Sequence, residues 1–279
     1  MKVLISSAWK SEQRSYDVAL WKKRKNLFSL SAPMINHFGL RFLKENVPGV
    51  CILEYPSRDE YLGRLNEGWD VVGISFYINE TNDAIEMANL ARRHNIRQVW
   101  AGNYGAFTPS IQQHFDRTFS GWGEAPLAEA VGQEITALKH PPLFMEMKYR
   151  DIKLQTWGVL FTSRGCNKSC TFCQTPAFYR KPHILDLRTL EEVVLQYKKI
   201  GVEQVIILDE NFGYFEDFTS REVIGLLRKY GLKWNPLTRV ETLSKNYESW
   251  VREGLCGASL GVESLNQASL DGARKGNDV

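Results

Sequence analysis

The chain has 279 residues, of which 43% are hydrophobic and 24% charged, and its formal net charge is +3. This length can bury one large or two modest cores, and the composition is that of a globular protein rather than a disordered or membrane-spanning one. The small net charge gives no signal for nucleic-acid binding, and no apolar run reaches the roughly 18 residues of a membrane span or forms a signal peptide. We therefore expect a cytoplasmic protein, whose five cysteines bind metal or do chemistry rather than form disulfides.

The amino-terminal half alternates between short apolar segments and segments with helical periodicity. Strands are predicted at residues 2–7, 50–55, 70–76 and 98–102, and helices at 34–47, 59–66 and 80–94. Strands joined by helices of this length favour right-handed crossovers and a parallel sheet with helices on both faces. We predict a doubly wound, Rossmann-like domain over residues 1–136.

Ligands of such a sheet lie beyond the carboxyl ends of its strands. The corresponding loops here are residues 75–79, 102–107 and 120–126. Their glycines either let the backbone approach a ligand closely or only turn the chain. Their bulky aromatic side chains either stack on a planar ligand or fill its place: Tyr77, Tyr104 and Trp122.

The second half is predicted to begin after a linker at residues 137–155, where paired prolines interrupt the periodicity. An apolar strand from Thr156 leads directly into a group of cysteines. Further strands are predicted at 202–210, 232–241 and 257–263, and helices at 187–201 and 219–231. Four beta-alpha units of this kind are typical of a (β/α) barrel or part of one, here over residues 156–279.

Three of the five cysteines fall in SRGCNKSCTFC, residues 163–173, with the spacing C-x3-C-x2-C. Thiolates are soft ligands that suit zinc or an iron-sulfur cluster. A closed zinc site needs a fourth ligand, which Cys256 or His183 could supply in three dimensions. Three thiolates on a four-iron cluster instead leave one iron open to bind a substrate or cofactor, and this is the preferred interpretation. Cys51 and Cys256 are interpreted as packing residues rather than ligands.

The spacing C-x3-C-x-aromatic-C, preceded by Arg-Gly and a strand, resembles the signature of the radical S-adenosylmethionine (SAM) superfamily. The resemblance runs from about residue 156 to the end of the chain. It implies a 4Fe-4S cluster on Cys166, Cys170 and Cys173, whose open iron binds SAM. One electron, from a donor such as flavodoxin or ferredoxin, then cleaves SAM to methionine and a 5'-deoxyadenosyl radical, which abstracts hydrogen from the substrate.

Other positions resemble the cofactor contacts of this family. Phe172 is expected near the adenine, and Asp209, Glu210 and Asn211 stand where many members have a glycine-glycine-glutamate stretch that holds the methionine amine. Arg239 and Glu241 are predicted on one face of a strand, from which an arginine could pair with the SAM carboxylate. Glu263 and Ser264 belong to GVES, which resembles a stretch at the fourth strand of many members. The alternative for Phe172 is a core aromatic, and for the charged residues a solvated loop or an internal salt bridge.

The amino-terminal order of DVVGIS, AGNYGAFTPS and SGWGEAP resembles the cobalamin-binding domain that precedes many radical SAM enzymes. Relatives that bind cobalt through histidine carry D-x-H-x-x-G after the first strand, whereas residues 8–26 contain no histidine. If cobalamin binds, we expect no histidine ligand from this domain, and we interpret His37 and His94 as helical packing or surface residues. The reaction could be methylation of an unactivated carbon, a rearrangement or another radical conversion, and the substrate is unknown.

The family barrel usually has six strands, whereas the last predicted strand here is the fourth. Asn277 and Asp278 resemble the start of a helix, so the chain looks cut. An open sheet edge exposes backbone hydrogen-bonding groups and invites association, and a partner chain could complete the barrel. A non-catalytic iron-sulfur or zinc binding module, or a truncated remnant, is therefore the second hypothesis.

Overall fold

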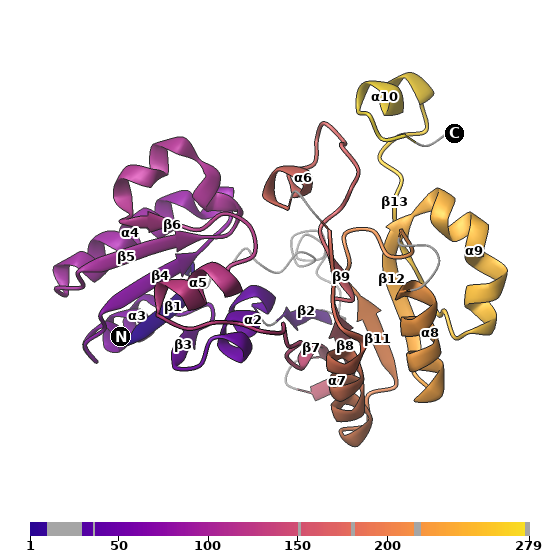
Figure 1. Cartoon of the computed structure of the whole chain (residues 1–279), viewed down its shortest axis with the longest axis horizontal. Coiled ribbons are helices and arrows are strands. Elements are labelled where there is room, and N and C mark those ends of the chain that lie inside the picture. Colours follow the sequence, from indigo (N-terminus) through magenta and orange to yellow (C-terminus); the bar gives the residue numbers. More distant parts are fainter. Residues whose placement is uncertain (10–29, 36, 150–151, 180–181, 215–218, 277–279) are drawn as a thin grey trace. The chain divides into compact units, whose positions relative to one another are not determined.

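The computed structural model of the chain describes residues 1–9, 30–35, 37–149, 152–179, 182–214 and 219–276. The chain divides into two compact units (Figure 1). Unit 1 comprises Met1–Pro141 and Met147–Leu154, and unit 2 comprises Pro142–Glu146 and Gln155–Val279. Both are α/β with parallel sheets, which confirms the predicted fold class. Within the described residues, no helix is long and apolar enough to cross a membrane.

Unit 1 is built on a five-stranded sheet. Its strands are β1 (Val3–Ser7), β3 (Val50–Leu53), β4 (Val71–Ser75), β5 (Gln98–Gly102) and β6 (Arg117–Thr118). Their order is β3-β1-β4-β5-β6, and each neighbouring pair is parallel. Because β1 lies between β3 and β4, the connections depart in opposite directions there, which is the switch point where such sheets bind ligands.

Helices cover both faces of this sheet. They are α2 (Phe38–Asn46), α3 (Arg58–Leu65), α4 (Thr81–Arg93) and α5 (Glu124–Ala130), with short 3-10 turns η1 (Ile78–Glu80), η2 (Tyr104–Phe107) and η3 (Pro109–His114). Side chains alternate along a strand, so Leu4 packs in the core that contains Met87 of α4. Val3 packs in the opposite core, which contains Leu40 of α2.

The first helix of unit 1 begins later than predicted. Met34 belongs to strand β2 (Leu30–Ile35), and α2 begins at Phe38 rather than at residue 34. His37 is the N-cap: its Nδ1 accepts a hydrogen bond from the Leu40 N–H (3.2 Å) and so satisfies one of the free donors of the first turn. His94 is the C-cap of α4. Both histidines therefore have structural roles at helix ends.

Unit 2 contains four parallel strands, each followed by a helix (Figure 1). The strands pair in the order β8 (Ile152–Leu160), β11 (Gln204–Ile207), β12 (Lys233–Arg239) and β13 (Ser259–Gly261). The helices are α7 (Leu187–Lys199), α8 (Thr219–Lys229), α9 (Val240–Arg252) and α10 (Gln267–Gly272). Between the first strand and its helix lie β9 (Ser163–Arg164), α6 (Thr175–Phe178) and β10 (His183–Ile184), of which β9 and β10 pair antiparallel.

Two predicted boundaries in this half are wrong. The segment predicted as a linker contains strand β7 (Leu143–Tyr149). The Tyr197 hydroxyl of α7 accepts from the Leu143 N–H (3.1 Å) and donates to the Leu143 carbonyl (2.9 Å), so long-range contacts order this stretch. The strand predicted to extend through Glu241 ends at Arg239, and α9 begins at Val240. Trp250 of α9 packs its ring 5.3 Å from that of Trp234 and fixes this helix on the sheet.

The sheet of unit 2 has an edge at β13. Within the described residues β13 pairs with β12 alone, so its other side carries no strand partner in that part of the chain. The helix start predicted at Asn277 and Asp278 lies outside the described residues, as does most of the region in which D-x-H-x-x-G was sought.

Candidate functional site

The three clustered cysteines lie in one loop at the carboxyl ends of the strands of unit 2, the edge at which α10 also lies (Figure 1). Gly165 precedes Cys166 with φ +87°, a left-handed conformation that favours glycine. The Lys168 N–H donates to Cys166 Sγ (3.5 Å), and the Cys173 N–H donates to the Cys170 carbonyl (3.1 Å). Cys166 and Cys170 are partly buried and Cys173 is exposed. A tight loop thus presents three thiols, one of them open to solvent.

The surroundings of Cys166 disfavour its thiolate while no cation is bound. Burial raises the pKa of the Cys166 thiol, and the charges of Cys173, Cys170 and Glu210 raise it further, against the Lys168 N–H, which lowers it. A bound cation reverses this balance, because thiolates that ligate a metal are deprotonated.

Zinc and an iron-sulfur cluster require different positions of the three thiols. Among the described residues, no group of three or more His, Cys, Asp or Glu side chains is gathered closely enough to hold one ion. Neither His183 nor Cys256 therefore completes a zinc site in this structure. Thiolates that hold a four-iron cluster bind different irons and need not converge on one point. The donor set fits an iron-sulfur cluster.

Asp209, two residues after the end of β11, anchors the start of the cysteine loop. Its carboxylate is fully buried and accepts hydrogen bonds from the Thr162 N–H (2.7 Å) and hydroxyl (2.5 Å), and from the Ser163 N–H (3.0 Å) and hydroxyl (2.8 Å). Burial raises the pKa of Asp209 to about 6, although these hydrogen bonds act to lower it. All four contacts are made to the chain itself, so Asp209 fixes the segment that precedes the cysteines.

Glu210 and Asn211 follow Asp209 in the chain, and their hydrogen bonding differs from that of Asp209. Glu210 Oε2 accepts from the Gly165 N–H (2.9 Å), beside Cys166, and burial raises the pKa of Glu210. Asn211 is 5% exposed, and neither atom of its side-chain amide has a hydrogen-bond partner among the described residues. Buried polar groups are normally paired, so an orphaned amide calls for a ligand, ion or water.

Arg239 and Glu241 pair, but not as neighbours on a strand. Arg239 ends β12, Glu241 lies in the first turn of α9, and the Arg239 Nε donates to the Glu241 carboxylate. The Arg239 Nη2 also donates to the Lys275 carbonyl (2.6 Å). An internal salt bridge, the alternative interpretation of these two charged residues, is therefore present.

The remaining predicted residues lie on the cysteine loop and after β13. Phe172 is 56% exposed, so it is not a core aromatic. Glu263 forms an ion pair with Lys275. Ser264 forms a turn, its hydroxyl accepting from the Asn266 N–H (3.0 Å) at the start of α10. Sequence reasoning missed Lys275 (5% exposed) and Arg164 (1% exposed). Both occur in polar segments, and nothing in a linear pattern marks a charge as buried.

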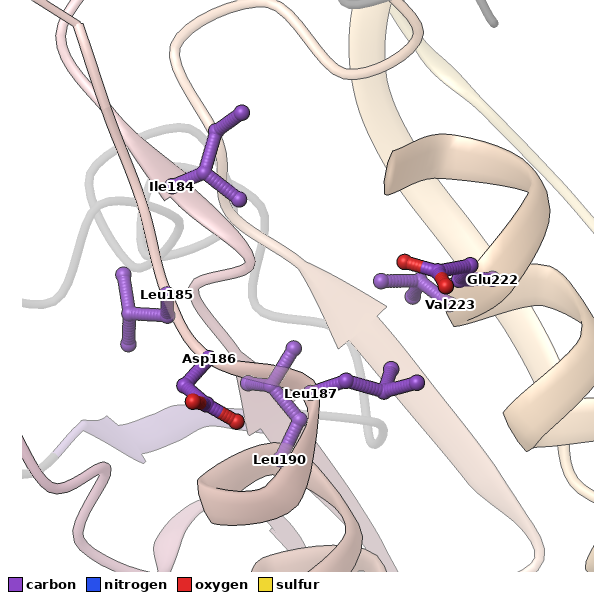
Figure 2. A pocket seen from close by; sticks show the side chains of 7 residues that line it. All are labelled: Ile184, Leu185, Asp186, Leu187, Leu190, Glu222 and Val223. Atoms are coloured by element: carbon purple, nitrogen blue, oxygen red, sulfur yellow. The ribbon is translucent and has the colours of Figure 1, made fainter. Parts of the chain in front are cut away.

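A pocket of about 420 Å³ lies elsewhere in unit 2, between the first turns of α7 and α8 (Figure 2). Its lining is apolar apart from two carboxylates, and consists of Ile184, Leu185, Asp186, Leu187, Leu190, Glu222 and Val223. Asp186 caps α7 by accepting from the Arg188 N–H (2.7 Å). None of the predicted site residues lines this pocket, so a substitution in it is a suitable control for the cysteine loop.

The carboxyl edge of the sheet in unit 1 is aromatic. The rings of Tyr77 and Tyr104 stack with centroids 6.1 Å apart, and Tyr77 is 47% exposed. Gly105 lies against Phe76, where an added Cβ would come within 2.8 Å of the Phe76 carbonyl oxygen, so this loop needs a glycine. A Cβ at Gly102 would meet nothing within 4 Å. The edge thus offers an exposed flat ring beside open space.

Among curated proteins, the chain is similar to an uncharacterised methyltransferase of Pyrococcus horikoshii, with 24% identity over 254 residues that cover 74% of this chain and 54% of that protein. It is also similar to the bacteriochlorophyllide d C-12(1)-methyltransferase of Chlorobaculum tepidum, with 28% identity over 126 residues, 43% of this chain and 27% of that protein. The chain thus spans about half the length of the first of these relatives, and about a quarter of the second.

Among solved structures, the chain shares its fold with the radical SAM methyltransferase TsrM of Kitasatospora setae. One structure of TsrM has tryptophan and a SAM analogue bound, and another has cobalamin and a [4Fe-4S] cluster bound. Each superposes with a TM-score of 0.68 at 15% identity and covers 99% of this chain, and the chain covers 62% and 64% of those two chains, respectively.

The family resemblance seen in the cysteine motif is confirmed by a family model. Residues 160–278 match the model described as the Radical SAM superfamily. The matched segment begins at the last residue of β8 and contains all three clustered cysteines and every residue predicted to contact SAM. Residues 160–278 thus form a radical SAM domain.

Proposed function

We propose that the chain forms the cofactor-binding part of a radical SAM enzyme, with a 4Fe-4S cluster on Cys166, Cys170 and Cys173. The observation that carries the proposal is the cysteine loop itself. Three thiols lie in a loop whose base is hydrogen-bonded to Asp209 and Glu210, and no fourth protein ligand is gathered with them in the described residues. A cluster held in this way keeps one iron available for SAM.

The chain's own residues hold and orient the reacting groups. When bound, the cluster would supply one electron to SAM and release methionine and a 5'-deoxyadenosyl radical. Asp209 and Glu210 fix the backbone before Cys166, so the loop is positioned before the cluster binds. The Asn211 amide can both donate to and accept from a polar group of SAM. The exposed ring of Phe172 can lie against the adenine.

We further propose methyl transfer as the reaction class, because the relatives named above are methyltransferases. Cobalamin is the proposed second cofactor, bound at the carboxyl edge of unit 1. The support is the switch point at β1, the flat exposed ring of Tyr77 and the open space at Gly102.

Anaerobic reconstitution with iron and sulfide, followed by reduction in the presence of SAM, tests the radical SAM proposal. We expect about four irons per chain, as a 4Fe-4S cluster requires, and formation of 5'-deoxyadenosine that depends on the reductant. Stoichiometric zinc without iron uptake, or iron without 5'-deoxyadenosine, would instead support the second hypothesis of a non-catalytic metal-binding module.

Titration with hydroxocobalamin tests the cobalamin proposal. We expect a change in the visible spectrum and co-elution with the protein on a sizing column at micromolar concentration. Both His37 and His94 are occupied at helix ends, so changing either to alanine should leave the spectrum of the bound cofactor unaltered. No spectral change in the wild-type protein would mean that unit 1 is a scaffold.

A further inference from the structure

Residues 273–275, which follow α10, connect the cysteine loop to the ends of β12 and β13, and we call them the clasp. The Ala273 carbonyl accepts a hydrogen bond from the Thr171 N–H (2.9 Å), between the second and third clustered cysteines. The Lys275 carbonyl accepts from Arg239 Nη2 (2.6 Å) at the end of β12. The Lys275 ammonium pairs with Glu263, just after β13. Three separate loops thus meet at the clasp.

The ammonium of Lys275 is enclosed, since only 6% of this side chain is exposed. Lysine is almost never buried unless it is paired. Besides the Glu263 carboxylate, its Nζ lies 6.0 Å from the centroid of the Phe172 ring. The absence of a side chain at Gly261 leaves room for it: a Cβ there would lie 2.9 Å from Nζ and 3.0 Å from Glu263 Oε1.

The backbone of Glu263 indicates that this arrangement is constrained. Its φ of +57° is left-handed, which is uncommon for a residue with a Cβ. Such conformations persist where the surroundings hold them, and they gather at functional sites. The ion pair with the enclosed ammonium is the contact that holds the Glu263 side chain.

We propose that Lys275 is a positioning residue of the cofactor site, which holds Glu263 and Phe172 and joins the cysteine loop to the ends of β12 and β13. The proposal rests on the proposed function for the identity of the cofactor. Loops that leave different strands move independently unless something links them. Linking them before SAM binds reduces the ordering that binding must supply, which increases affinity.

The link is tested first without any cofactor, by hydrogen exchange at the Thr171 amide. K275M keeps an unbranched side chain of similar length but removes the charge. We expect the Thr171 amide to exchange at least about tenfold faster in K275M than in the wild type, since local opening governs exchange. K275R should restore the wild-type rate. K199M, at an exposed position at the end of α7, is the matched control and should change nothing at Thr171.

The positioning role is tested next in the reconstituted protein. We expect K275M to hold as much iron and sulfide as the wild type, yet to bind SAM about tenfold more weakly. The change that SAM causes in the electron paramagnetic resonance spectrum of the reduced cluster should be smaller in K275M, and K275R should restore it. If K275M does not fold, G261A serves instead, because its added Cβ displaces the ammonium without removing a charge.

The outcomes separate the two proposals. Equal exchange at Thr171 and equal SAM affinity in wild type and K275M would overturn the role of Lys275, and so would a K275R protein as impaired as K275M. A wild-type protein that takes up no cluster, or binds no SAM, would refute the proposed function and with it the cofactor role of Lys275. In that case, faster exchange of the Thr171 amide in K275M than in the wild type would still show that Lys275 stabilises the clasp.

Discussion

The carboxyl edges of the two parallel sheets are built differently. In unit 1 the edge carries stacked tyrosines and glycine loops, and the buried His37 is used to cap a helix. In unit 2 the edge buries Asp209, Arg239 and Lys275, all within the segments that hold or contact the cysteine loop. Buried charges destabilise a fold unless they are paired. The unit 2 edge thus buries charged residues of both signs, whereas Glu80 and Glu124, the charged residues buried at the unit 1 edge in the described part of the chain, are both carboxylates.

The largest effect is expected from the cysteines of unit 2. C166A, C170A or C173A should each abolish the cluster and the brown absorption of the reconstituted protein, because two thiolates leave a second iron without a protein ligand. Formation of 5'-deoxyadenosine should fall below detection. Iron content per chain is the direct measurement, with E222Q in the separate pocket as control. Full iron content in any of the three variants would show that its cysteine is not a ligand.

The second prediction concerns pH and Asp209. Burial raises the pKa of Asp209 in the folded protein to about 6, against about 4 in the unfolded chain. Between these values the folded carboxyl stays protonated while the unfolded one ionises, so stability falls as the pH rises. The free energy of unfolding should drop by about 2 kcal/mol from pH 4 to pH 6 through this group.

D209N removes this titration. Denaturant unfolding at pH 4 and pH 6 should therefore show a smaller loss of stability in D209N than in the wild type, and the difference between the two proteins isolates Asp209 from the other carboxylates. Equal losses in both would mean that burial does not raise this pKa.

The third prediction concerns the buried side-chain amide of Asn211 in unit 2. Asn211 is buried without a partner among the described residues, so N211A should not destabilise the fold through a lost hydrogen bond. If the amide binds SAM, however, its loss should weaken SAM binding by about tenfold, with iron content unchanged. Isothermal titration of the reconstituted protein measures this affinity. Unchanged affinity would assign Asn211 to another ligand or to a buried water.

The smallest effect is expected from the two cysteines outside the loop. Cys51 packs partly buried against the core of unit 1, whereas Cys256 is exposed and donates from Sγ to the Trp234 carbonyl (3.3 Å). Cys256 was predicted to be a packing residue, but its side chain is exposed, so this interpretation is wrong for Cys256. C51A and C256A should both leave iron content unchanged. A loss of the cluster in C256A would reopen the question of a fourth ligand.

The cysteine motif and the alternation of strands and helices were readable from the sequence, because each depends on local spacing. The strand at residues 98–102 was predicted with the bounds that β5 has in the structure. Boundaries failed where distant groups decide them. The predicted linker contains β7, whose Leu143 bonds to Tyr197, and the first helix starts at its His37 cap, which also contacts Glu54 (2.8 Å).

For the candidate site, the sequence alone determined the three thiols, their loop and the strand ends around them. Only the tertiary structure decided what each polar residue does there. In the fold, Asp209 accepts hydrogen bonds from the backbone of residues 162 and 163. The Asn211 amide has no partner in the described residues, and Lys275 is enclosed beside Glu263. The physical reason is that burial and pairing of a charge depend on segments far apart in the chain, and a linear pattern carries no record of which segments will enclose it.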